Sequence, residues 1–495
     1  MNVLLVNPDT PITFWSFKHA LKFVSKKAML PPLGLLTVAG LLPEDWSKKL
    51  VDMATTKLRD RDIKWADYVF VTAMFIQKDS ARRVIDRCKK LGTKVVAGGP
   101  LFTAVPEDYA DVVDHLVLGE AETTLPEFLD DAKQGCPKRI YKSCQWADMK
   151  DTPMPLWELA KVKKYALMCL QYSRGCPYNC DFCDVTMLFG HKLRTKSKDQ
   201  VLQELESLYS TGWRSQVFFV DDNFIGNKQK LKKEILPAII GWMEEKKYPF
   251  SFNTQTSIDL ADDEELMKLM VEAGFDCVFV GIETPNQDSL TECNKLQNKG
   301  RDLVACVKKI QQFGMEVQGG FILGFDSDQP SAFENLIRFI QESGIVTAMV
   351  GLLNAPRGTK LYRRLMSENR LLRYATGDNT DLSINFIPKM NREDLLRGYQ
   401  KVVRTIYSQK YFSERVMTFL RNYKPLDRTE VKFGYRDIKA FIKSVWRIGI
   451  ISRGSIYYWK LVLWSLRRPR YFYLAVTFAI CGFHFRKMFA GYQNV

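Results

Sequence analysis

The chain has 495 residues, more than one ordinary domain holds, and its composition of 46% hydrophobic and 26% charged residues excludes a disordered protein. Eleven scattered cysteines and an N-terminus without a signal-peptide pattern argue against a disulfide framework, so we expect a cytoplasmic protein. The net charge of +16 falls almost entirely after residue 380, where 22 Lys and Arg stand against 7 Asp and Glu.

Residues 1–140 alternate short apolar runs with helical patterns. The runs that we expect to form strands are residues 3–6, 68–71, 94–97 and 115–118. Each run ends in small or turn-forming residues, such as Gly98-Gly99-Pro100. This alternation predicts an α/β domain with a doubly wound, Rossmann-like parallel sheet, whose ligands bind at the carboxyl ends of the strands.

A linker over residues 141–163, which contains Pro153 and Pro155, leads into a second α/β series over residues 164–380. Its expected strands are residues 166–171, 217–220, 250–253, 277–280, 318–323 and 347–352, with helices at 199–209, 263–273 and 302–313. Six strand–helix units predict a partial (β/α)6 barrel with its chemistry at the carboxyl ends of the strands.

Residues 381–495 form a basic, aromatic-rich segment that we expect to be mostly helical. Its longest uncharged run, residues 471–485, is shorter than the 20 or so apolar residues of a spanning helix, so it predicts a buried or interfacial helix. Three interpretations stay open for this domain: packing on the rest of the protein, contact with an anionic membrane surface, or attraction to nucleic acid.

Three cysteines lie within eight residues directly after the first expected barrel strand: Cys176, Cys180 and Cys183. Thiolates are soft ligands that bind iron–sulfur clusters, and one loop with three of them leaves the fourth iron of a cubane open. A zinc site would need a fourth ligand, for which His191 is the nearby candidate, and its spacing does not match a zinc finger. The loop therefore predicts a [4Fe–4S] cluster.

The spacing Cys-x3-Cys-x-Phe-Cys, with Phe182 before the last cysteine, resembles the radical S-adenosylmethionine (SAM) superfamily. This resemblance implies that the cluster binds SAM and that one electron cleaves it to a 5′-deoxyadenosyl radical. It also implies SAM contacts from Phe182, from Asp221, Asp222 and Asn223 after the second barrel strand, and from Glu283 after the fourth. The chain departs from the common Gly-Gly-Glu form at the second strand, and the alternative role for these carboxylates is to cap a helix or to stabilise a loop.

The domain order, with a doubly wound domain before the barrel, resembles the cobalamin-binding subfamily. The residues that this resemblance places at the cobalamin are Asn7, Pro32, Gly34, Thr72, Ala73, Met74, Gly98, Gly99, Gly119 and Glu120. The Asp-x-His-x-x-Gly motif of mutase-type domains does not occur, so His19 and His115 are expected to be structural and cobalt to have no histidine ligand. The alternative is a degenerate Rossmann-like module used for packing.

The C-terminal residues 385–390 and 482–487 resemble the helical domain of hopanoid methylases. All three segments together imply a cobalamin-dependent radical SAM methyltransferase that methylates an unactivated carbon of a hydrophobic small molecule through methylcobalamin and the deoxyadenosyl radical. The alternatives are a non-methylating cyclisation, rearrangement or oxidation, and a binding protein with a structural cluster. The expected partners are a lipid-like substrate, flavodoxin or ferredoxin as electron donor, and the inner face of a membrane, with no nucleic acid.

Overall fold

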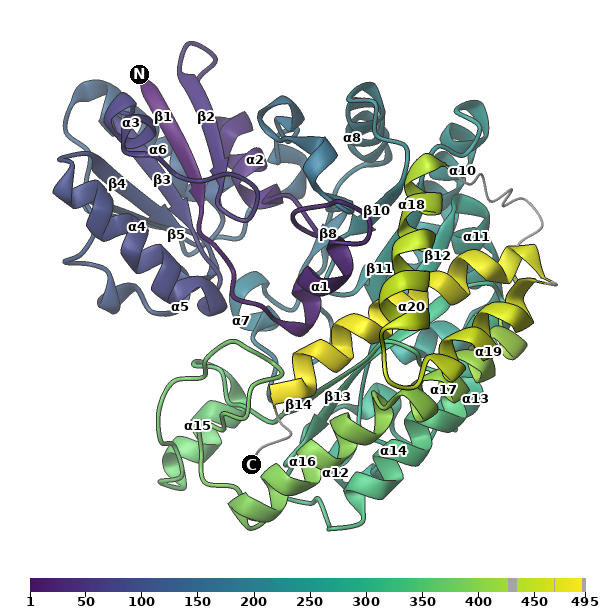
Figure 1. The fold of residues 1–495 in the computed structure, drawn as a ribbon. Coiled ribbons are helices and arrows are strands. Elements are labelled where there is room, and N and C mark those ends of the chain that lie inside the picture. The colour runs from purple at the N-terminus through teal and green to yellow at the C-terminus, as the bar shows by residue number, and fades with distance from the viewer. Residues whose placement is uncertain (426–433, 467, 492–495) are drawn as a thin grey trace.

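A computed structural model describes residues 1–425, 434–466 and 468–491. Two parallel sheets lie side by side, and helices of the C-terminal segment pack across the second one (Figure 1). The parts of the basic C-terminal segment at residues 426–433, 467 and 492–495 lie outside the described residues.

The first sheet has six parallel strands in the order β2-β1-β3-β4-β5-β6. Their bounds are β1 Asn2–Asn7, β2 Ser47–Asp52, β3 Tyr68–Thr72, β4 Lys94–Gly98, β5 His115–Leu118 and β6 Ile140–Lys142. The strand order runs outward in both directions from β1 and β3, which confirms the doubly wound topology. Strands β2 and β6 were not predicted from the sequence. Both are edge strands, and their exposed Lys side chains hide the apolar pattern of a strand.

Helices cover both faces of this sheet. Successive residues of β1 point to opposite faces, so Leu4 packs toward α4 (Lys78–Lys90) while Leu5 packs toward α2 (Leu33–Leu41) and α6 (Ala121–Gln134). The shorter helices α3 (Asp60–Trp65) and α5 (Pro100–Ala104) complete the layers. All the loops that follow the strands therefore gather at one edge, as the sequence predicts for a ligand-binding domain.

The second sheet is a partial barrel of six parallel strands in chain order, with β7 and β14 at its two edges. The strands are β7 Met168–Leu170, β10 Gln216–Phe219, β11 Ser251–Thr256, β12 Phe275–Glu283, β13 Glu316–Leu323 and β14 Ala348–Leu352. The helices outside it are α8 Lys198–Ser210, α10 Leu236–Glu245, α11 Glu264–Ala273, α13 Leu303–Gln312, α14 Ala332–Ser343 and α15 Lys360–Ser367. All six expected strands are present.

The C-terminal segment is helical, as expected, and it packs on the barrel. Its helices are α16 Arg392–Ile406, α17 Gln409–Asn422, α18 Tyr435–Ser444 with the π-helical continuation η11 Val445–Ile450, α19 Ser455–Leu466 and α20 Pro469–Phe489. Helices α16 and α17 lie against α14. The Tyr407 hydroxyl donates a 2.6 Å hydrogen bond to the Ala348 carbonyl on edge strand β14.

The C-terminal helix α20 and the N-terminal segment pack against each other. Phe14 stacks on Phe485 with ring centroids 4.4 Å apart, and His484 Nε2 lies 3.0 Å from the Phe14 carbonyl oxygen. The neighbouring Trp15 meets Phe279 of barrel strand β12 edge-on at 5.4 Å. The uncharged run 471–485 therefore lies within a helix that covers the barrel (Figure 1).

Candidate active site

The three cysteines lie on one loop that a short hairpin holds at its base. Strand β8 (Ser173–Arg174) pairs antiparallel with β9 (Arg194–Thr195), and the loop with helix α7 (Val185–Phe189) lies between them. Gly175 follows β8 with φ +94°, and a Cβ there would lie 2.8 Å from the Lys192 carbonyl oxygen. Only glycine can start this loop without moving the returning strand.

The thiols of Cys176, Cys180 and Cys183 are half-buried and unbridged. Burial raises the pKa of Cys183 to about 12. Among the described residues no three His, Cys, Asp or Glu side chains are grouped to hold one metal ion. A cubane cluster takes one thiolate on each of several irons, so three thiols along one loop fit this group without meeting at a single point.

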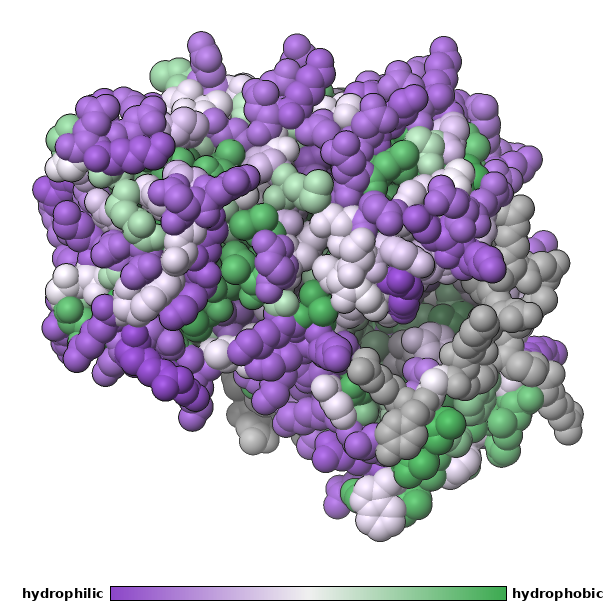
Figure 2. Space-filling model, turned by 90° about the horizontal axis from the view of Figure 1, so that it is seen from above, coloured by the Kyte–Doolittle hydropathy of each residue, from purple (hydrophilic) through white to green (hydrophobic). Residues whose placement is uncertain are grey.

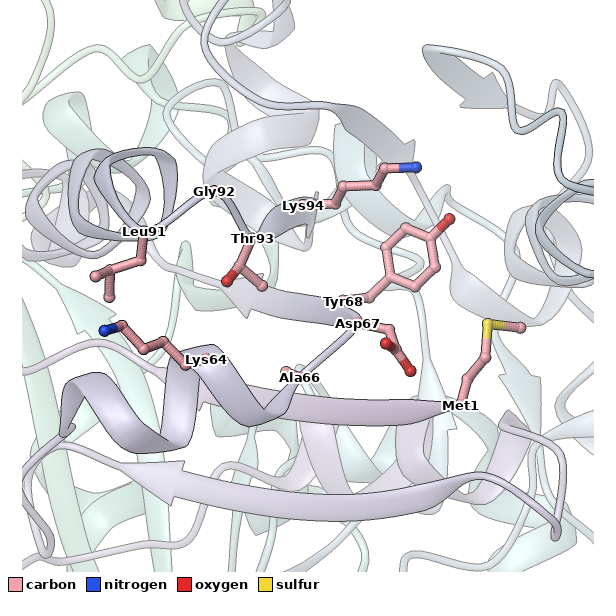
Figure 3. Close-up of a pocket in the computed structure, with 9 residues that line it drawn as sticks. All are labelled: Met1, Lys64, Ala66, Asp67, Tyr68, Leu91, Gly92, Thr93 and Lys94. Atoms are coloured by element: carbon pink, nitrogen blue, oxygen red, sulfur yellow. The ribbon is translucent and has the colours of Figure 1, made fainter.

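A cavity of about 220 Å³ opens beside Cys180 and Cys183. Its far wall comes from the start of α15, and three basic side chains line it: His191, Lys360 and Arg363. A larger hollow of about 600 Å³ lies elsewhere, where β1, β3 and β4 begin (Figure 3). That hollow is at the edge of the first sheet opposite the strand ends, so it does not belong to this site.

Asp221 and Asp222 follow β10 and lie behind the cysteine loop. Asp221 is fully buried and accepts hydrogen bonds from the backbone N–H groups of Tyr172 and Ser173, so it supports the strand that enters the loop. Burial and the nearby Asp221 raise the pKa of Asp222 to about 7. Asp221 therefore stabilises the loop entrance, and Asp222, which lies beside the Gly175 backbone, stays a predicted SAM contact.

Asn223 and Phe182 are two further residues that the sequence predicts to contact SAM. Asn223 is buried, its Nδ2 lies 3.4 Å from Ser257 Oγ, and its Oδ1 has no hydrogen-bond partner. An unpartnered buried oxygen is costly, so this atom is suited to accept a bond from a ligand. Phe182 packs beside Phe325, with ring centroids 6.5 Å apart.

Glu283 ends β12 with φ +63°, an unusual backbone conformation for a residue other than glycine. Lys295 Nζ lies 2.8 Å from its Oε1. Burial lowers the pKa of Lys295, and its interactions with Glu283 and with the nearby Cys180 and Cys183 outweigh this effect and raise it. Gln297 Nε2 lies 3.8 Å from Cys180 Sγ. The sequence analysis missed Lys295 and Gln297 because no motif marks the loop that carries them.

At the cobalamin edge of the first sheet, two of the expected glycines face open space. A Cβ on Gly34 or on Gly119 would meet no protein atom within 4 Å, and both residues are exposed. A Cβ on Gly99 would instead lie 2.3 Å from Thr72 Oγ1, so these strand ends pack on each other. Open glycines at the carboxyl edge fit a large planar cofactor that approaches the backbone closely.

The other expected cobalamin residues divide into two groups. Pro32 precedes α2, Gly98 ends β4, Ala73 is buried and Met74 is exposed after β3. The side chains of Asn7 and Glu120 have partners within the protein, and their contact with cobalamin stays a prediction. Asn7 donates to Asp52 at 3.0 Å and lies 3.3 Å from Gln77 Nε2.

Glu120 is buried at an interface between the two sheets' loops. Its Oε1 lies 3.0 Å from Arg174 Nη1, and its Oε2 lies 2.7 Å from Arg194 Nη1 and 2.8 Å from the Ala147 nitrogen. Glu122 adds a 2.8 Å contact to Arg174 Nη2. The carboxylate therefore holds the base of the cysteine loop, and only the backbone beside Gly119 is left to face a cofactor.

Comparison with known proteins decides the family. Family models match in the same order as the three parts of the chain: a B12 binding domain at residues 24–129, the radical SAM superfamily at 170–340, and a domain of unknown function (DUF4070) at 359–494. The chain is 40% identical over 490 residues to the uncharacterized methyltransferase sll1242 of Synechocystis sp. (strain ATCC 27184 / PCC 6803 / Kazusa), covering 98% of this chain and 91% of the relative.

It is also 33% identical over 481 residues to the hopanoid C-2 methylase of Rhodopseudomonas palustris (strain TIE-1), covering 94% of this chain and 89% of that enzyme. The chain belongs to the cobalamin-binding radical SAM methylases. The structure of the cobalamin-dependent SAM radical enzyme OxsB, with aqua-cobalamin and SAM bound, has the same fold, with a TM-score of 0.66 at 14% identity over 99% of this chain and 80% of that one.

As a cobalamin-binding radical SAM methylase, the protein is an enzyme that uses a [4Fe–4S] cluster, SAM and cobalamin, and it catalyses methyl transfer. Methylation was the principal expectation from the sequence.

The two histidines that we expected to be structural have partners within the protein. His19 lies beside His484, with ring centroids 5.6 Å apart, and His115 Nδ1 lies 2.7 Å from the Lys138 carbonyl oxygen. Both histidines are thus structural. Among the described residues, no helix has the length and apolarity to span a bilayer.

Proposed function

We propose that this enzyme methylates an unactivated carbon of a polycyclic hydrophobic lipid of the hopanoid class. The observation that carries the proposal is the 33% identity to hopanoid C-2 methylase, which extends through all three parts of the chain. A match confined to the barrel would support only radical chemistry. Similarity that includes the C-terminal helices covers the elements that enclose the barrel, and these elements can determine the substrate.

The barrel interior supports an apolar substrate. Four apolar side chains on the barrel strands keep partial exposure between buried neighbours: Phe218, Phe279, Ile322 and Met349. Trp15 adds an aromatic surface against Phe279. Apolar residues on an inner face that do not fill their own space provide contacts for an apolar ligand.

The residues that we assign to the cofactors follow from the geometry above. Cys176, Cys180 and Cys183 would hold the cluster, while Asp222, Asn223 and Glu283 would contact SAM. The bound cofactors supply a hydrogen-abstracting radical and a methyl group, and the protein orients them. Lys295 holds Glu283 in its strained conformation and places a positive charge beside the cysteine thiols.

For cobalamin, we assign the edge formed by Pro32, Gly34, Thr72, Ala73 and Met74, together with the backbone of Gly98, Gly99 and Gly119. His19 packs beside the His484 ring and His115 Nδ1 lies against the Lys138 carbonyl, so we assign neither histidine to the cofactor. This assignment agrees with the absence of the mutase-type motif from the sequence.

Two partners complete the proposal. Lys360, Arg363 and His191 line the opening beside Cys180, and we assign this basic opening to a one-electron donor with an acidic face, such as flavodoxin or ferredoxin. A membrane contact through the C-terminal helices would bring the enzyme to its lipid substrate.

The test is an anaerobic assay of the reconstituted enzyme with a hopene, a reductant and SAM that carries a deuterated methyl group. We expect a product in which one labelled methyl group replaces a hydrogen of the hopene ring system. Methylation of a bacteriochlorophyllide or another cyclic substrate, with none of the hopene, would keep the enzyme class and overturn the substrate.

A further inference from the structure

The helix formed by α18 and η11 presents a row of large apolar side chains to solvent. Ile438, Ile442, Trp446 and Ile450 recur at every fourth residue and are 51%, 62%, 59% and 59% exposed. This spacing places all four on one face of a helix. Buried Ala440, Ser444 and Ile448 lie on the opposite side.

The neighbouring helix α19 extends this surface. Its inner side is fixed to the first helix, because Trp459 Nε1 donates to the Gly449 carbonyl at 2.9 Å and the Tyr458 hydroxyl lies 2.8 Å from Ser444 Oγ. Its outer side and the connecting turn expose four more large apolar residues: Ile451, Ile456, Leu463 and Leu466. Together these eight residues form what we call the apolar face. Figure 2 shows apolar residues gathered at the lower right, on the side of the C-terminal helices.

Charge identifies what this face contacts. Exposed cations accompany it at Lys439, Arg447, Arg453 and Lys460, and the sequence contains no acidic residue after Asp437. The Asp437 carboxylate is occupied by the Gly434 N–H at the start of α18. An exposed apolar face with Trp at its centre and a basic border is the pattern of helices that lie in the interface of an anionic bilayer. Nucleic acid would use the cations and leave eight apolar side chains in water.

The apolar face also lies beside the segments that cover the barrel. Lys443 Nζ donates to the Lys22 carbonyl at 2.8 Å, and the Arg447 guanidinium lies 5.7 Å from the Phe23 ring. Helix α18 also packs on α20. A membrane bound to the apolar face would therefore lie close to α20 and to the segment around Phe23, which cover the barrel.

We propose that the apolar face of α18, η11 and α19 docks the enzyme on an anionic lipid bilayer, with Trp446 at the headgroup level. This inference deepens the membrane contact in the proposed function and rests on it for its purpose, but its evidence is independent of the substrate. Docking by this face would leave α20 packed on the barrel and would need no spanning helix.

The experiment is co-sedimentation of the full-length holoenzyme with vesicles of phosphatidylcholine alone or of phosphatidylcholine with phosphatidylglycerol. We expect binding to the anionic vesicles that weakens at high salt, and at least a tenfold loss of binding in Trp446→Asp and in Ile442→Asp. The matched control is Met366→Asp. Met366 lies on α15, outside the apolar face, and is 56% exposed, so this variant should bind the vesicles as the parent protein does. Thermal unfolding of each variant confirms that it folds.

Three results would overturn the docking. These are no binding of the parent protein to anionic vesicles, equal loss in the Met366→Asp control, and a dimer that the Trp446→Asp variant dissociates without any vesicle binding. Activity on detergent-dispersed substrate separates the two proposals. Trp446→Asp should keep that activity when docking alone is lost, whereas a parent enzyme inactive on the hopene refutes the substrate and leaves the docking result standing.

Discussion

Arg174 Nη2 lies 2.8 Å from Glu122 Oε1 although 52 residues separate them, and both side chains are at least 90% buried. The arginine stands two residues before Cys176, the first cysteine of the loop, and the glutamate stands in the helix that follows strand β5 of the B12-binding domain. Buried charges are tolerated only when they are paired, so this contact ties the cysteine loop to the cobalamin domain.

Replacement of Arg174 by Gln should destabilise the protein and loosen the cluster loop. It leaves Glu120 and Glu122 buried with fewer cationic partners, and breaking a buried pair in this way costs about 3–5 kcal/mol. Urea unfolding of the apoprotein and iron content after reconstitution measure the two effects. The double variant Arg174→Gln, Glu122→Gln should recover part of the loss, because it removes both charges.

The control is Arg82→Gln, which breaks a 3.2 Å pair with Asp86 on the surface of α4. Both of its side chains are about half exposed, so the change should stay below about 1 kcal/mol. If Arg174→Gln and Arg82→Gln unfolded at the same urea concentration with the same iron content, the linking role of Arg174 would be wrong.

Removal of any one of the three loop cysteines should abolish the cluster. Cys180→Ala leaves two thiolates, and we expect reconstituted protein with little iron and no charge-transfer absorption. The matched variant is Cys306→Ala in α13, a half-buried thiol outside the loop, which should keep the iron content of the parent protein. Full iron in Cys180→Ala would refute the ligand assignment.

Gly34→Leu should separate cofactor binding from folding. A Cβ on Gly34 meets no protein atom within 4 Å and the residue is exposed, so the helix should be as stable as before or slightly more so. We expect at least tenfold weaker cobalamin retention, because the leucine side chain would enter the proposed cobalamin-binding site. Gly241→Leu in α10 has equally open surroundings and should retain cobalamin normally. Equal cobalamin retention by both variants would refute the assignment of the cobalamin site to the start of α2.

His484 should make folding stability depend on pH. Burial lowers its pKa to about 4, so between pH 6.5 and 4 the unfolded chain binds a proton that the folded chain does not. Stability from this residue is therefore complete above pH 6.5 and declines as the pH falls toward 4, by at most about 3 kcal/mol. His484→Gln should show a smaller fall in Tm between pH 7 and pH 5. Parallel Tm profiles of the two proteins would contradict this.

The sequence predicted what local patterns specify. The cysteine loop could be predicted because its three cysteines lie close together in the sequence. Strand β5 could be predicted because its four consecutive residues are apolar or buried, as in an interior strand. Edge strand β2 was not predicted because its first three residues, Ser47, Lys48 and Lys49, are polar and hide the pattern of a strand. The roles of Lys295 and Arg194 were not predicted, for two different reasons. Lys295 lies only 12 residues from its partner Glu283, but no motif marks its loop. Arg194 lies 74 residues from Glu120, and only the packing of the two domains brings them together.

The proposed reaction of this enzyme is cobalamin-dependent methylation of a hydrophobic lipid by radical chemistry. The most direct measurement quantifies the SAM-derived products in an anaerobic reaction of the holoenzyme with a hopene. We expect S-adenosylhomocysteine and 5′-deoxyadenosine in equal amounts, matched by methylated hopene. Deoxyadenosine without S-adenosylhomocysteine, and with an unmethylated product, would contradict it.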